Sequence, residues 1–337
     1  MGAQMKDTLA LSIGPHLAYQ RFMESVSVNM FQMPYHMRFD QSFLAKMLNF
    51  IKSARSIPKG YKYYISESCY YYPAAARKLG RIDGKIIDLC ASSIYYYILI
   101  KKIGGVSRKV LLNLLKDVDG FVFEGDFVGD VVRGLGIHKP SMTAYTYVKP
   151  ERYETLLRNR PNLKAKNISI TATNDYFYKG LDLVLEALRI VNESDPEITL
   201  TIAPNKDMKF DCVKHLLTDN VKINYDVQDM LKKTSLYVHP ARGDVFPVAP
   251  LEAMLAGVPV MVSEATGTKE VVEKVREDYV TPIDSERIAE KITEYFSLNH
   301  MQRLRLSNGF RSAAKPFNEK TQVSDFKRKY EDFIRSV

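Results

Sequence analysis

Apolar residues occur along this chain in short runs, and the segments between the runs carry apolar residues at helical spacing. Such runs predict buried strands, and the intervening segments predict helices. In the first 150 residues the predicted strands lie at 8–13, 25–30, 62–66, 85–90, 120–124 and 141–145. The predicted helices lie at 16–24, 40–54, 70–78, 92–102 and 109–116. This alternation is typical of a parallel sheet with helices on both faces.

The rest of the chain repeats the pattern more regularly. Its predicted strands lie at 167–172, 197–203, 221–224, 235–239 and 258–262. We therefore predict an α/β protein with two doubly wound, Rossmann-like domains, 1–150 and 151–314, that face each other across a cleft. The polar segment 148–165 is the predicted connection. The charged, amphipathic stretch 315–337 is predicted to be a helix that packs back across the domain boundary.

The segment YVHPARGDVFPVAPLEAMLAGVPVMV, residues 237–262, is the most informative part of the chain. It predicts a buried strand, a polar loop, a short helix and a second buried strand. Pro250 suits the first turn of the helix because the N–H that proline lacks would be unpaired there, and Gly257 suits the left-handed backbone at the helix end. The loop therefore brings a helix N-terminus and the carboxylates of Asp244 and Glu252 into one small volume. Such a volume suits the phosphate and the hydroxyls of one ligand.

Composition limits the class of protein. The chain has 337 residues, 46% of them hydrophobic, and no apolar run approaches the roughly 20 residues that a membrane-spanning helix needs. No secretory signal is visible at the N-terminus. Cys69, Cys90 and Cys212 have no metal-ligand spacing and are odd in number. These features fit a reducing cytoplasm.

Charge is divided unevenly between the halves. Residues 1–150 hold 20 Lys and Arg against 11 Asp and Glu, a net charge of +9, whereas residues 151–337 hold 28 of each. This asymmetry indicates an anionic partner for the first half. Residues 93–109, SIYYYILIKKIGGVSRK, combine aromatic and aliphatic residues with four cations. We expect this segment either to lie on an anionic membrane surface on the cytoplasmic face or to form a buried helix with a solvated end.

The run PARGDVFPVAPLEAMLAGVPVMVSEATGTKEVV resembles the donor-site signature of the family 4 retaining glycosyltransferases, which have the GT-B fold. Asp244 stands at the first acid of that signature and Glu252 at the second, with seven residues between them. The run KGLDLVLEAL, from Lys179, resembles a second segment of the same family. The resemblance covers residues 115–275 well and the first 110 residues poorly.

The resemblance implies transfer of a sugar from a nucleoside diphosphate to an acceptor, with the anomeric configuration retained and with no metal or cofactor. Lys179 is implied to bind the diphosphate, Glu252 the ribose hydroxyls and Asp244 the sugar hydroxyls. The predicted catalytic residues are Asp244, Lys179 and His16. The other predicted donor-binding residues are Gly14, Asn174, Val227, Val245, Phe246 and Val248. The structural alternatives are a solvent-facing lysine for Lys179, a helix-start acid for Glu252 and a turn-forming aspartate for Asp244.

The chain departs from the family in three places. Asn174 stands where the family has an arginine that binds the diphosphate, and Asp244 is one methylene shorter than the usual glutamate. The family histidine of the first domain is replaced by the run LCASS, so His16 is the nearest alternative. Asp117 and Asp119 form a D-x-D triplet, but they precede a predicted strand, where aspartate is common in turns.

Three hypotheses remain open from the sequence. The first is an active, metal-independent glycosyltransferase with a glycan or lipid-linked, anionic acceptor. The second is a degenerate relative that binds a nucleotide sugar or a glycan without turnover. The third is a glucosyltransferase of nucleic-acid bases, but the chain resembles no base-flipping device and its tyrosines cluster with aliphatic residues. We therefore do not expect a nucleic-acid partner.

Overall fold

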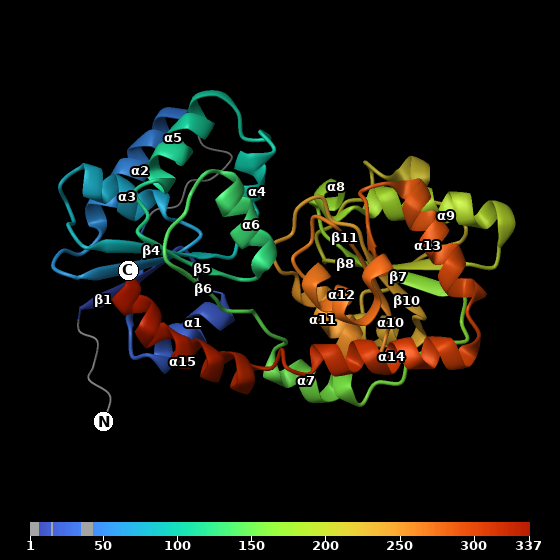
Figure 1. Cartoon of the computed structure of the whole chain (residues 1–337). Helices are drawn as coiled ribbons and strands as arrows, with labels where there is room; N and C mark the ends of the chain where they lie inside the picture. The colour runs from blue at the N-terminus through green and yellow to red at the C-terminus, as the bar shows by residue number, and fades with distance from the viewer. Residues whose placement is uncertain (1–6, 15, 35–42) are drawn as a thin grey trace. The chain divides into compact units, whose positions relative to one another are not determined.

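The chain folds into two α/β units, each built on one parallel sheet. The computed structural model describes residues 7–14, 16–34 and 43–337, and for residues 43–46 it describes the backbone only. Contacts within the chain divide it into Met1–Thr146 with Lys320–Val337, the first unit, and Tyr147–Glu319, the second unit. Figure 1 shows helices on both sides of each sheet.

The first unit contains a six-stranded sheet in the order β2-β1-β3-β4-β5-β6. Its strands are β1 (Thr8–Ser12), β2 (Asn29–Gln32), β3 (Tyr63–Glu67), β4 (Lys85–Cys90), β5 (Gly120–Phe123) and β6 (Ser141–Thr143). Its helices are α1 (Leu17–Ser25), α2 (Phe43–Ser56), α3 (Tyr71–Lys78), α4 (Ile94–Leu99), α5 (Gly105–Leu115), α6 (Asp126–Gly134) and the C-terminal α15 (Glu319–Ser336). Phe326 of α15 stacks on Phe22 of α1 with ring centroids 4.6 Å apart, which attaches the end of the chain to the first unit.

The second unit contains a six-stranded sheet in the order β12-β11-β10-β7-β8-β9. Its strands are β7 (Asn167–Ala172), β8 (Thr199–Pro204), β9 (Val221–Ile223), β10 (Leu236–His239), β11 (Val260–Ser263) and β12 (Val280–Thr281). Its helices are α7 (Pro150–Leu157), α8 (Tyr176–Lys179), α9 (Leu181–Ser194), α10 (Val227–Lys233), α11 (Val248–Leu255), α12 (Lys269–Arg276), α13 (Ser285–Ser297) and α14 (His300–Ala314).

Several predicted boundaries move. The strand predicted at 25–30 begins only at Asn29, because α1 continues to Ser25 and Ser27 takes a left-handed turn with φ of 56°. β2 is an edge strand with half-exposed side chains, so its apolar pattern is weak. The helix predicted at 92–102 is shorter, because Lys101 has a φ of 61° and α5 starts at Gly105. Residues 40–42 of another predicted helix lie outside the described residues.

Each sheet has one point where the strand order reverses. In the first unit the reversal lies between β1 and β3, and in the second it lies between β7 and β10. At such a point the two following loops leave in opposite directions, and ligands of open parallel sheets bind in the crevice between them. The fold therefore predicts two crevices, one after Ser12 and Glu67 and one after Ala172 and His239.

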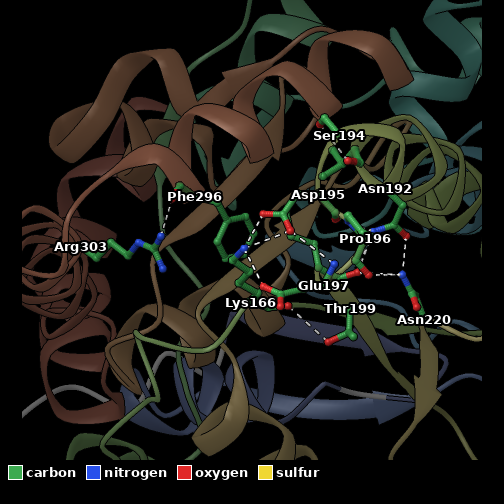
Figure 2. A network of polar contacts seen from close by, with 12 residues as sticks. Lys166, Asn192, Ser194, Asp195, Pro196, Glu197, Thr199, Asn220, Phe296 and Arg303 are labelled. Atoms are coloured by element: carbon green, nitrogen blue, oxygen red, sulfur yellow. Dashed lines mark hydrogen bonds and ion pairs between the residues drawn. The ribbon is translucent and has the colours of Figure 1, made fainter.

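Polar side chains connect the amino ends of strands in the second sheet, at the end away from the crevice (Figure 2). Lys166 Nζ lies 2.8 Å from Asp195 Oδ2 and 3.0 Å from Glu197 Oε2. Asn192 Nδ2 donates to the carbonyl oxygens of Asp195 and Ile198 at 3.1 and 2.9 Å. These contacts join the end of α9 to the starts of β7 and β8. These contacts therefore stabilise the amino ends of the strands, whereas the candidate site lies at their carboxyl ends.

A carboxyl group is fully buried in the first sheet. Asp88 on β4 is 0% exposed and accepts hydrogen bonds from the hydroxyls of Ser66 and Tyr95. Burial raises the pKa of Asp88 from 3.8 to about 7, and the two hydroxyls oppose that rise. The folded chain therefore holds a proton on Asp88 at a pH where the unfolded chain has lost it.

The first prediction concerns the pH dependence of stability. Between about 4 and about 7 the folded state binds more protons at Asp88 than the unfolded state does, so this group makes the free energy of unfolding fall as pH rises. Asp88→Asn is expected to flatten that dependence. Urea unfolding at pH 5 and pH 8 measures it, with the exposed Asp130→Asn as the control. An unchanged slope in Asp88→Asn would show that Asp88 ionises normally.

Candidate functional site

The loop between β10 and α11, residues 240–247, is held between two close backbone approaches. Gly180 joins α8 to α9 with a φ of 74°, and a Cβ atom there would lie 2.2 Å from the carbonyl oxygen of Pro240. A Cβ atom on Gly267 would lie 1.5 Å from the carbonyl oxygen of Val245. Only glycine fits either position. The loop is therefore fixed from both sides.

Main-chain hydrogen bonds set the position of Asp244 within this loop. The backbone N–H of Asp244 donates to the carbonyl of Ala265 at 3.0 Å, and the N–H of Gly267 donates to the carbonyl of Asp244 at 2.8 Å. Asp244 and Thr266 form an isolated parallel bridge. The acid is thus attached to the loop that follows β11.

Arg242 fastens the same loop to the segment that carries Lys179. Its guanidinium donates to Asp182 Oδ1 and Oδ2 at 2.8 and 2.7 Å and lies 4.0 Å from the centroid of the Phe177 ring. Its backbone N–H donates to the carbonyl of Tyr178 at 2.7 Å. A two-pronged guanidinium–carboxylate contact of this kind fixes orientation as well as distance.

The structure brings Lys179 and Asp244 together at the reversal between β7 and β10. Lys179 Nζ lies 2.6 Å from Asp244 Oδ2, and His239 Nε2 lies 3.1 Å from the same oxygen. Burial would raise the pKa of Asp244, but the hydrogen bond from His239 and the charge of Lys179 outweigh it, so the pKa is lowered. Burial lowers the pKa of His239, which favours its neutral form. Asp244 is therefore a fixed negative charge.

Glu252 lies in the first turns of α11 and is nearly buried. Its Oε1 is 2.7 Å from Arg152 Nη1 of α7, and 9% of its side chain is exposed. Burial raises the pKa of Glu252, and the charges of Arg152 and Lys149 oppose this rise only in part. The segment predicted as a connection, 148–165, thus contains a helix that supplies the cation for this acid.

The residues between the two acids contribute backbone. The side chains of Val245 and Phe246 are buried, and the Phe246 ring lies 5.6 Å from that of Phe317. Val248 is the first residue of α11, after Pro247. Because these two side chains are buried, any contribution of Val245 and Phe246 to a ligand site comes from the backbone, beside the positive end of the helix at Val248.

Two other predicted donor-binding residues have structural contacts. Asn174 Nδ2 donates to the carbonyl of Asp207 at 3.0 Å, and its Oδ1 accepts from the N–H of Lys209 at 3.0 Å. Both ends of this amide therefore hold a neighbouring loop. Val227 opens α10, whose first turn is capped by the carboxylate of Asp226. Val227 is half-buried, and its position after β9 is away from the reversal point.

Gly14 and His16 lie at the reversal point of the first unit. Both are exposed, and the N–H of His16 donates to Glu67 Oε2 at 3.3 Å. Burial raises the pKa of Glu67 to about 7, although the hydrogen bond from His16 opposes the rise. Asp117 and Asp119 have structural partners, since Lys78 pairs with Asp117 and Arg77 with Asp119.

Sequence reasoning missed four residues of these two crevices. They are His239, Arg242, Arg152 and Glu67. His239 and Glu67 each end a predicted or observed strand, and a titratable residue in that position is a usable signal at a sheet's carboxyl edge. Arg152 and Arg242 carried no such signal, because their partners depend on how helices pack. Within the described residues, no cluster of potential metal ligands occurs and no helix is long and apolar enough to cross a membrane.

Solved structures define the class of fold. The chain superposes on HepE from Anabaena, in complex with UDP and glucose, with a TM-score of 0.65, 15% identity and coverage of 98% of this chain and 100% of that one. It superposes on sucrose-phosphate synthase from Thermosynechococcus elongatus with a TM-score of 0.70, 12% identity and coverage of 98% and 100%. The predicted α/β, GT-B fold class is confirmed.

A family model matches the sequence of the second unit. Residues 154–312 match the model of Glycosyl transferases group 1. The lipopolysaccharide glucosyltransferase WaaG of Escherichia coli is 27% identical over 61% of this chain and 56% of its own length. The amylovoran biosynthesis glycosyltransferase AmsK of Erwinia amylovora is 26% identical over 40% and 36%. The chain therefore spans about half or less of the length of these relatives. The resemblance to glycosyltransferases is confirmed at this level.

The second prediction tests the attachment of the loop. Arg242→Lys keeps the charge but loses the pair of hydrogen bonds to Asp182 and the stacking on Phe177. We therefore expect the free energy of unfolding of the second unit to fall by about 1–3 kcal/mol. Urea unfolding measures it. Arg189→Lys, at an exposed position on α9, is the control. Equal stability of the two variants would contradict the proposed attachment.

Proposed function

We propose that the chain is a metal-independent, retaining glycosyltransferase that moves a sugar from a nucleoside diphosphate to an acceptor hydroxyl. The observation that carries the proposal is the group of charges at the reversal between β7 and β10. Lys179 and Asp244 meet there, next to the positive end of α11, and Glu252 lies in the first turns of the same helix. The glycosyl transferases group 1 domain at 154–312 supports the same reading.

In this proposal Lys179 and the N-terminus of α11 bind the diphosphate, because both are positive. Glu252 accepts hydrogen bonds from the ribose hydroxyls. Asp244 accepts them from the sugar, because its side-chain contacts with Lys179 and His239 both use Oδ2 and leave Oδ1 for the ligand. Lys179 must then leave Asp244 or be shared with the diphosphate. The backbone of Val245, Phe246 and Val248 completes the donor site.

The reaction would break the bond between the anomeric carbon and the diphosphate oxygen and form one to the acceptor oxygen. The acceptor proton would leave with the diphosphate. Positive groups that stabilise the departing charge lower the barrier without a metal. Retention follows if the acceptor attacks on the face from which the diphosphate leaves. His16 and Gly14, at the crevice of the first unit, are proposed to contribute to the acceptor side of the reaction.

A nucleotide-sugar binder without turnover is the second candidate. Asn174 favours it, because an uncharged amide replaces a cation there and both of its ends are already bonded to Asp207 and Lys209. Ser92 and Ser93 stand where the related enzymes have a histidine. A protein that only binds the nucleotide sugar would still use Lys179 and Glu252 to hold it, but it would release no sugar.

The third prediction tests the donor site. Lys179→Ala and Glu252→Ala are each expected to weaken nucleoside diphosphate binding about 10–100-fold, since each removes a charged hydrogen-bonding partner of the ligand. Calorimetry measures the affinity. Lys206→Ala and Glu264→Ala, at exposed positions of the same unit, are the matched controls.

Turnover separates the two candidates. Hydrolysis of UDP-, GDP- and ADP-sugars in the presence of EDTA, followed by NMR of the released sugar, should show one accepted donor and retention at the anomeric carbon. Binding without release would support the second candidate. Unchanged affinity in both Lys179→Ala and Glu252→Ala would remove the donor-site assignment altogether.

The acceptor is proposed to be anionic, as a lipid-linked glycan on the cytoplasmic face of a membrane is. The net charge of +9 in residues 1–150 supports this proposal. Within residues 93–109, Tyr95 and Ile98 are buried, so the α4 end of the segment belongs to the core. Lys101, Lys102 and Lys109 are exposed, and so are Ile100 and Val106, at 48% and 77%. The turn from α4 to α5 is thus the part that can meet a surface.

The fourth prediction tests that turn. Lys101→Glu combined with Lys102→Glu should weaken binding to phosphatidylserine vesicles about thirtyfold or more, because each lysine near an anionic surface contributes about 1 kcal/mol. Liposome flotation measures it. Lys164→Glu with Lys222→Glu, exposed positions of the second unit, makes the same change in net charge.

Equal loss in both double variants would assign binding to net charge and not to this turn. Tight binding of duplex DNA with a steep salt dependence, and none to vesicles, would replace the membrane proposal with a nucleic-acid partner.

A further inference from the structure

His239 is the last residue of β10, and its side chain contacts the carboxylate of Asp244. Its imidazole is 2% exposed, and Nε2 lies 3.1 Å from Asp244 Oδ2. The Tyr237 ring lies nearly parallel to it, at 11° and with centroids 6.4 Å apart, so the ring is held by packing. His239 therefore reaches the acid from the rigid sheet, not from a loop.

The surroundings of the ring fix where its proton must lie. Nδ1 is buried and has no hydrogen-bond partner among the described residues. Asp244 is negatively charged and can only accept, so the ring must donate from Nε2. Burial keeps the ring neutral, and Nδ1 then carries the lone pair. The arrangement is a neutral imidazole aimed at one carboxylate oxygen.

We propose that His239 is a positioning residue that orients Asp244 toward the sugar of the donor. The inference rests on the proposed function and extends it by one residue. Lys179 and His239 share Oδ2 in the free chain, and Lys179 is the partner that a diphosphate would draw away. His239 carries no charge for the diphosphate to attract. It keeps Oδ2 in place when the donor binds and leaves Oδ1 for the sugar hydroxyls.

The short side chain of Asp244 suits this contact. An aspartate has one methylene fewer than a glutamate, so its carboxylate stays close to its own backbone. His239, the last residue of β10, reaches it there at 3.1 Å.

The proton position is tested first, without any ligand. Nitrogen-15 NMR of the histidine side chains at pH 7 should show His239 neutral with its proton on Nε2. Asp244→Asn should shift the Nε2 resonance. A proton on Nδ1, or a charged ring, would overturn the proposal, and this result does not depend on whether the chain binds a nucleotide.

The second test compares the affinity for UDP-glucose with the affinity for UDP, and repeats the comparison with a GDP-sugar and GDP and with an ADP-sugar and ADP. In each case the ratio of the two affinities isolates the contribution of the sugar. His239→Asn places an amide only near the position of Nδ1 and should lower the ratio about tenfold, with UDP affinity unchanged. His239→Gln places its amide near Nε2 and should restore most of the loss. Thermal unfolding of both variants checks that the fold persists.

The outcomes separate the two proposals. If the native chain binds none of these nucleotides, the proposed function is wrong, and the NMR result still decides the contact. If it binds them and His239→Asn leaves the ratio unchanged, or His239→Gln is as impaired as His239→Asn, then His239 does not position Asp244. A role in packing alone would lower stability in both variants and leave both ratios unchanged.

Discussion

The site depends on the close approach of backbone to backbone on either side of the 240–247 loop. The carbonyl oxygens of Pro240 and Val245 lie where a Cβ atom on Gly180 or Gly267 would be. These two contacts bring α8, β10 and the loop after β11 to one point, and only then can Lys179 reach Asp244 at 2.6 Å. The parallel sheet supplies the crevice, and the two glycines make it narrow enough for charges to interact.

In the second unit, each of the two acids has a cation from another element beside it, which opposes the effect of burial on its pKa. Asp244 is paired with Lys179, and Glu252 with Arg152. A buried carboxylate without such a partner would take up a proton and lose its capacity to bind hydroxyls. The two pairs differ in one respect. Arg152 has no anion to attract it from Glu252 in the proposed complex, whereas Lys179 faces the place proposed for a diphosphate.

The sequence predicted those parts of the site that local chemistry determines. The strand, loop, helix and strand at 237–262 are confirmed, and so are Pro250 in the first turn and Gly257 at the end, with a φ of 82°. These features depend on residues a few positions apart. Arg152 reaches Glu252 across 100 positions of the chain because α7 packs on α11, and no periodicity encodes that contact. The edge strand β2 was misplaced for a related reason, since its side chains are only half covered.

One carboxyl group at each reversal point, Asp244 in the second sheet and Glu67 in the first, has a shifted pKa, and the two shifts have opposite directions although the topology is the same. Paired charges lower the pKa of Asp244, while burial raises the pKa of Glu67 to about 7. Around neutral pH Glu67 of the first crevice therefore changes charge, whereas Asp244 of the second does not. A constant charge suits a group that must hold hydroxyls under all conditions, which is the role proposed for Asp244. Glu67 and Asp88, both in the first unit, should consequently contribute to the pH dependence of the protein near neutrality.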